Sequence, residues 1–209
     1  MTRRTLRLTV AAAVAALALP LAACQTHQGT AAYIGDTRIT TNEVDEQVDN
    51  FYSDPFWAEQ GKGQRSAVHN RTVNAMIISV LLEKTARAAG IDVPTSAIDK
   101  TEKDFKAQPQ QIPQGLQGSP PRVAAEVSVY ASALQTKFVK GATSQDEVNQ
   151  RFEKALADAR REHPITVNPR YGTFDPKTLG LVQTKVSGVR DVQPAAPAGE
   201  EPQPDQQQN

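Results

Sequence analysis

The sequence predicts a mainly α-helical protein with about five helices and a small β-element formed by an N-terminal hairpin and a C-terminal strand. Three observations support this fold class. Apolar residues recur at helical spacing in several segments between residues 41 and 163. Two short β-prone runs flank tight-turn residues at the start of this region, and a third β-prone run follows it.

The first element is expected to be the hairpin. Residues 31–40, "AAYIGDTRIT", have the pattern of strand, turn and strand, with the turn at Gly35 and Asp36. A hairpin this short needs a further partner to be stable. We therefore expect the run at residues 165–168 to pair with it, which would bring the two ends of the domain together.

A capping box predicts where the first helix begins. Glu43 lies three residues after Thr40, so each side chain can bond to the other residue's backbone N–H. The Asp-Pro pair at residues 54–55 interrupts or kinks this helix, because proline cannot donate a backbone hydrogen bond. Phe56 and Trp57 lie just beyond the kink.

The strongest helix prediction covers residues 64–89. Its apolar stripe is wide, which indicates a central helix buried on more than one side. Gly90 suits its C-terminal cap. Three more helices are expected, from about residue 96 to 107, from about 120 to 140, and from the capping pair Ser144 and Glu147 to Pro164.

Two segments lack a helical or strand pattern. Prolines and glycines interrupt residues 108–121, which predicts a loop that contains the apolar residues Ile112 and Leu116. Residues 181–209 are rich in proline, glutamine and glutamate, which predicts a disordered tail. The folded domain is therefore expected to span residues 31–176.

Residues 1–23 have the layout of a lipoprotein signal peptide. Three arginines precede an apolar stretch that is short for a bilayer span. Cys24, the only cysteine, follows Leu-Ala-Ala in an order that resembles the bacterial lipobox, in which the cysteine thiol takes diacylglycerol. The prediction is lipidation at Cys24, a tether at residues 24–30, and a protein anchored at the outer face of the bacterial cell membrane. The paired arginines also resemble a twin-arginine motif, so both export routes stay open.

Charge and motifs exclude several classes of function. Loss of the signal removes three of 23 basic residues and none of 23 acidic ones, which leaves a net charge of −3 and argues against nucleic-acid binding. His27, His69 and His163 do not have metal-ligand spacing. No motif of a nucleophilic or metal-dependent hydrolase occurs. We therefore expect no catalytic residue, no metal and no cofactor.

Four segments together resemble the SurA and PrsA chaperone family. In chain order they are "AAYIGDTRITTNEVDEQV", "GIDVPTSAIDK", "TSQDEVNQRFEK" and "ITVNPRYGTFDP", and the last is similar to the ending of actinobacterial SurA-like lipoproteins. The resemblance covers about residues 31–176. It implies the helical chaperone module of that family, without the parvulin prolyl isomerase domain that often follows it.

The resemblance implies a lipid-anchored extracytoplasmic chaperone that holds unfolded exported polypeptides by apolar contact. Candidate client-binding residues are Phe56, Trp57, Met76, Ile112 and Leu116. The same residue types are also suited to the core. The alternative is a structural envelope lipoprotein that binds one dedicated partner. The sequence leaves the oligomeric state open.

Overall fold

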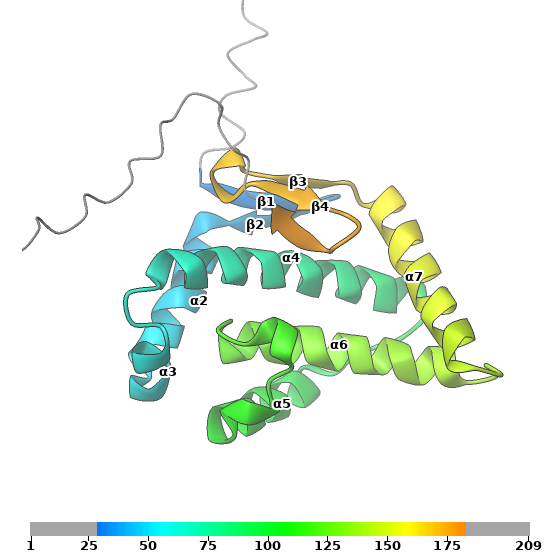
Figure 1. The fold of residues 1–209 in the computed structure, drawn as a ribbon. Coiled ribbons are helices and arrows are strands. Elements are labelled where there is room, and N and C mark those ends of the chain that lie inside the picture. Colours follow the sequence, from blue (N-terminus) through cyan, green and yellow to red (C-terminus); the bar gives the residue numbers. More distant parts are fainter. Residues whose placement is uncertain (1–28, 183–209) are drawn as a thin grey trace, which may run out of the picture.

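The computed structural model describes residues 29–182, and the predicted mainly helical fold class is confirmed (Figure 1). Within these residues there are six α-helices, one more than expected: α2 (Thr41–Ser53), α3 (Pro55–Gln60), α4 (Arg65–Ala88), α5 (Thr95–Ala107), α6 (Pro121–Val139) and α7 (Gln145–Glu162). The strands are β1 (Thr30–Ile34), β2 (Thr37–Thr40), β3 (Ile165–Val167), β4 (Thr173–Asp175) and β5 (Gly180–Val182).

The additional helix is α3. The pair Asp54–Pro55 ends α2 and also starts a new helix, because the Asp54 carboxylate accepts hydrogen bonds from the backbone N–H groups of Phe56 and Trp57. Proline at the first helical position already has the φ that a helix needs. The capping box that begins α2 is confirmed, with the Thr40 and Glu43 side chains bonded to each other's backbone N–H.

The expected closure of the sheet is confirmed. β1 lies between β2 and β3, and both pairings are antiparallel. Asn168, just after β3, extends the pairing: its backbone N–H donates to the Ala31 carbonyl at 2.9 Å and its Nδ2 donates to the Thr30 carbonyl at 2.9 Å. The strand that follows the last helix therefore pairs with the first strand of the domain.

Both domain boundaries extend beyond the predicted ones. Thr30, assigned to the tether, begins β1, and Leu181 and Val182, assigned to the tail, belong to β5. β4 and β5 form a second, two-stranded sheet, whose turn is fixed by bonds from Lys177 and Thr178 to the Asp175 carboxylate. The signal peptide, Cys24 and the tail from residue 183 lie outside the described residues.

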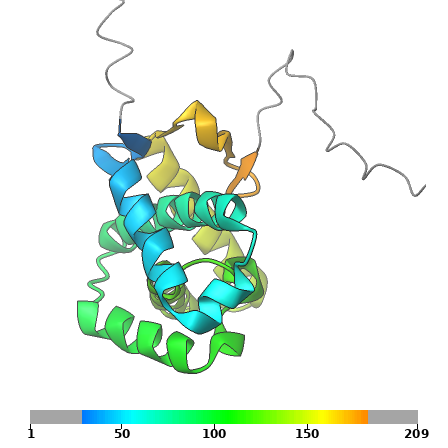
Figure 2. The same cartoon turned by 90° about the vertical axis from the view of Figure 1, so that its left-hand side faces the viewer.

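The core lies on two sides of α4. One cluster contains residues of the sheets, α2 and α4, among them Ile34, Phe51 and Ile77, and extends to α3, α5 and the start of α6. The other lies between α4, α6 and α7, and includes Leu81 and Leu134. Figures 1 and 2 show the resulting order of layers, with the sheets on one side of α4 and with α6 and α5 on the other. In residues 29–182 no helix is both long and apolar enough to cross a membrane.

We expect Asn168→Ala to lower the free energy of unfolding by about 1–2 kcal/mol, because it leaves the part-buried Thr30 carbonyl without its side-chain donor. Urea denaturation followed by circular dichroism measures this. Asn149→Ala, on the exposed surface of α7, is the matched control and should change stability little. Equal losses for the two variants would contradict the role given to Asn168.

A second prediction concerns the turn between α6 and α7. Hydrogen bonds from the Thr143 backbone and hydroxyl, together with Arg151, lower the pKa of the Glu147 carboxyl below its ordinary value. A lowered pKa in the folded state adds stability above the ordinary carboxyl range, and this contribution is lost as the pH falls below about 4.5. Glu147→Gln should therefore be less stable than the parent at neutral pH, and the difference should shrink towards pH 3.

Urea midpoints measured across this pH range test the prediction. Glu153→Gln is the control, since Glu153 is exposed on the same helix. A gap between Glu147→Gln and the parent that stays constant with pH would refute the assignment.

Candidate functional site

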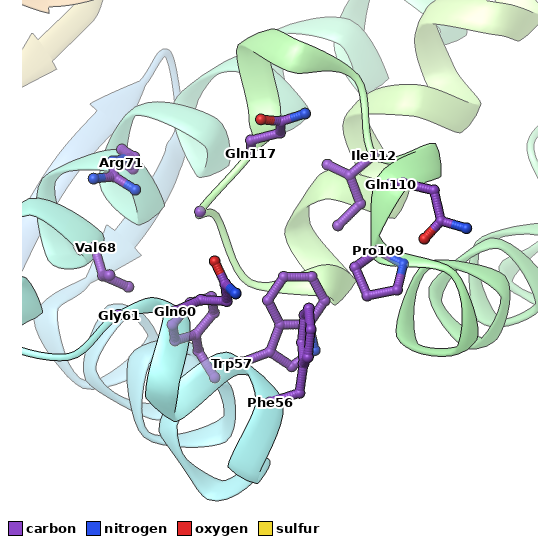
Figure 3. Close-up of a pocket in the computed structure, with 12 residues that line it drawn as sticks. Phe56, Trp57, Gln60, Gly61, Val68, Arg71, Pro109, Gln110, Ile112 and Gln117 are labelled. Carbon is purple, nitrogen blue, oxygen red and sulfur yellow. The ribbon is translucent and has the colours of Figure 1, made fainter.

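The candidate site is a cavity of about 340 Å³ between α3, the first turns of α4 and residues 109–118 (Figure 3). Figures 1 and 2 place α3 and α5 at the end of the molecule opposite the sheets. The cavity combines aromatic walls with amide side chains and one guanidinium group. Its lining residues are Phe51, Phe56, Trp57, Gln60, Gly61, Val68, Arg71, Pro109, Gln110, Ile112, Gln117 and Gly118.

Two aromatic residues of α3 form one wall. The Phe56 and Trp57 rings meet edge to face, with centroids 5.0 Å apart, and Trp57 also contacts Phe51 of α2 at 5.6 Å. Phe56 is 48% exposed, whereas Trp57 is only 5% exposed. Phe56 therefore presents an apolar ring to solvent, while Trp57 joins the cavity wall to the core.

Residues 109–118 form the opposite wall. They contain two short 3₁₀ turns, η2 (Pro109–Gln111) and η3 (Gln114–Leu116), rather than a regular α-helix or strand. Ile112, between the turns, is 2% exposed and packs into the first core cluster. The buried isoleucine holds this segment against the helices, so the wall has a defined position despite its prolines and glycines.

Arg71 of α4 supplies the only charge among the lining residues. Its Nη2 donates to the Gln64 Oε1 at 3.3 Å. The guanidinium lies directly over Gly118, where an added Cβ would come within 1.9 Å of Nη1. Gly118 also has a φ of +75°, which favours glycine at this position, and a larger residue would have to displace the guanidinium.

A second cavity of about 520 Å³ lies on the other side of Trp57 and differs in charge. Its two cationic side chains pair with a carboxylate, Lys106 with Glu102 at 2.6 Å and Arg122 with Glu102 at 3.2 Å. Asp54, which also lines this cavity, caps α3. Burial alone would lower the pKa of Arg122, but bonds to Asp99 and Glu102 raise it above the ordinary value. The cationic groups of this second cavity are therefore already paired with carboxylates of the protein.

The structure brings together three of the five predicted client-binding residues. Phe56, Trp57 and Ile112 line the aromatic cavity. Met76 is half-buried against the first core cluster, away from the described cavities. Leu116 lines a separate cavity of about 260 Å³.

Arg71 and the three lining glutamines were not among the residues predicted from the sequence. Arg71 follows Val68 by three residues, which places both on one face of α4. That spacing is the one signal by which the sequence could have indicated Arg71 as part of the site.

The charged groups elsewhere on α2 and α4 connect the two helices. His69 Nε2 lies 2.7 Å from Asp45 Oδ1, and the His69 ring stacks on Tyr171 at 5.6 Å. Asp49 pairs with Arg65. Over residues 29–182, no three His, Cys, Asp or Glu side chains are grouped to hold a metal ion. These contacts join α2, α4 and the segment after β3.

Comparisons of the chain with protein-family models, curated proteins and solved structures find no match. The site is therefore interpreted from its own geometry.

Trp57 is the only tryptophan in the chain, so its fluorescence reports directly on the cavity wall. Phe56→Ala should raise the quenching of Trp57 by acrylamide, because the Phe56 ring covers it. The cost in stability should be about 1 kcal/mol, since the Phe56 side chain is half-exposed. Val139→Ala, 51% exposed at the end of α6, is the control and should leave quenching unchanged. Unaltered quenching in Phe56→Ala would contradict this arrangement.

Proposed function

We propose that the protein is a lipid-anchored extracytoplasmic chaperone that holds segments of unfolded exported polypeptides without catalysis. The observation that carries the proposal is the aromatic cavity with amide side chains on its wall. Unfolded chains present apolar side chains and unpaired backbone groups, and a mostly apolar site with a few polar groups suits such ligands. The resemblance of four segments to the SurA and PrsA family supports the same function.

The position of the cavity agrees with a lipid anchor at Cys24. Four residues lie between Cys24 and Gly29, where the described chain begins, and the five residue steps from Cys24 to Gly29 span at most about 18 Å. A lipid on Cys24 would therefore hold the sheet end of the domain near the membrane. The cavity lies towards the other end, beside α3, and would face away from the bilayer (Figure 1).

The proposed mode of holding is the insertion of individual side chains into a cavity. Among the described residues, the large apolar side chains that are strongly exposed are Phe56, Val139 and Val182, and they belong to α3, α6 and β5. They do not form one broad apolar surface. A client would therefore be held chiefly where Phe56 borders the cavity.

The same scarcity of exposed apolar side chains favours a second candidate function. A structural envelope lipoprotein with one dedicated partner needs only a small site that fits one defined segment. Breadth of binding separates the two functions, because a chaperone tolerates unrelated sequences and a dedicated site does not.

Aggregation of chemically denatured proteins tests the proposal. Residues 25–209 keep every described core residue and lack the lipid site. At equimolar amounts they should suppress the light scattering of two unrelated denatured proteins on dilution. Phe56→Ala should weaken this suppression, and Val139→Ala should not. No suppression of either client would reject the chaperone function, and suppression of one client alone would favour a dedicated partner.

A further inference from the structure

We infer that the aromatic cavity selects polypeptide segments in which a carboxylate lies close to an apolar side chain, and that Arg71 binds this carboxylate. The inference rests on the proposed function and specifies the chemistry of the bound segment. The apolar side chain would lie against Phe56 and Trp57. The carboxylate would approach the guanidinium on the α4 side of the cavity (Figure 3).

The first argument is the charge state of Arg71. Its side chain is half-buried, and an arginine stays protonated in proteins. Within residues 29–182 no carboxylate lies within ion-pair distance of it, and its one hydrogen bond, to Gln64, is with a neutral amide. A partly desolvated cation without an anion is unfavourable, so an incoming carboxylate gains more here than at an exposed arginine.

The second argument comes from the contrast between the two cavities beside Trp57. In the larger one, Lys106 and Arg122 pair with carboxylates of the protein itself. In the aromatic cavity, no aspartate or glutamate is among the lining residues. Charge complementarity therefore favours an anionic ligand in the aromatic cavity and gives no such preference in its neighbour.

The third argument is the position of unpaired buried polar atoms. In the described part of the chain, two buried side-chain atoms have no hydrogen-bond partner: Trp57 Nε1 and Asn74 Oδ1. Trp57 lines the aromatic cavity, and Asn74 lines the smaller cavity next to Leu116. Arg71 lines both. An unpaired buried donor such as Trp57 Nε1–H is uncommon in folded proteins, and a carboxylate can accept its hydrogen bond. Asn74 Oδ1 is itself an acceptor, so it does not bear on an anionic ligand.

The size of the cavity restricts what can bind. About 340 Å³ is at the lower end of the range for ligand sites. It admits an apolar side chain with its flanking backbone and excludes a helix or a folded domain. A side-chain carboxylate and a terminal carboxylate share the required chemistry, so the experiment has to separate them.

Binding of matched peptides to residues 25–209, followed by Trp57 fluorescence, tests the inference. The first peptide is a short, end-blocked glycine–serine chain with one leucine and a nearby glutamate. In two others the glutamate is replaced by glutamine or lysine, and a fourth has glutamine and a free C-terminus next to the leucine.

The glutamate peptide should bind about fivefold more tightly than the glutamine peptide, and the lysine peptide more weakly still. Salt should reduce this preference. Preference for the fourth peptide alone would still support Arg71 as the anion site and would identify the terminal carboxylate as the ligand.

Variants test whether the preference for the glutamate peptide over the glutamine peptide depends on Arg71. Arg71→Gln should abolish it, while Arg71→Lys should keep part of it. Gly118→Ala should weaken it by displacing the guanidinium, and Gly63→Ala is its control, because Gly63 has a similar φ of +70° and nothing within 4 Å. Lys103→Gln, at an exposed site on α5, changes the net charge equally and should leave the preference intact.

Two results would overturn the inference. One is equal binding of all four peptides by the parent protein, and the other is a glutamate preference that survives in Arg71→Gln. If aggregation is nevertheless suppressed in either case, the proposed chaperone function stands and only the charge selectivity fails. A glutamate preference without any suppression of aggregation would support the site and reject the general chaperone.

Discussion

The rest of the structure depends on the burial of α4 on several sides. A helix with apolar and small residues around most of its circumference must be covered from more than one direction. The sheets and α2 cover one side of α4, and α6 and α7 cover the other (Figure 1). The Thr72 and Thr85 hydroxyls donate to carbonyls one turn earlier, at 2.8 and 2.7 Å, so burial leaves neither hydroxyl unpaired. The buried residues of α4 are Val68, Thr72, Val73, Ala75, Ile77, Ser79, Leu81, Leu82, Thr85 and Ala86.

Most of the fold was predictable because its signals are local or repeated. The Thr40–Glu43 capping box and the wide apolar stripe of α4 are visible in the sequence, and the need to pair a short hairpin led to β3. The elements missed by the sequence analysis are short. α3 has six residues and β5 has three, which is less than the length over which a periodic pattern can be recognised.

The candidate site was predictable only in part, because residue type does not distinguish a cavity wall from a core. Phe56, Trp57 and Ile112 reach the cavity, while Met76 packs elsewhere, and all four are apolar. The spacing of Arg71 from Val68 places both on one face of α4, but the distinguishing property of Arg71, the lack of a neighbouring carboxylate in the described structure, is not visible in the sequence. Tertiary contacts, such as those of Arg122 with Asp99 and Glu102, decide which charged side chains pair. The equal numbers of acidic and basic residues in the sequence do not reveal these pairs.

Because Trp57 and Ile112 belong to both the core and the cavity wall, ligand binding and stability must be linked. Trp57 contacts Phe51 in the core and Phe56 at the surface, so the wall cannot move far without disturbing packing. A rigid wall limits the size of the side chain that the cavity can admit. A ligand that fits also binds the folded state better than the unfolded chain, and therefore stabilises it. That stabilisation should be greatest for α3 and residues 109–118, because they form the two walls of the cavity.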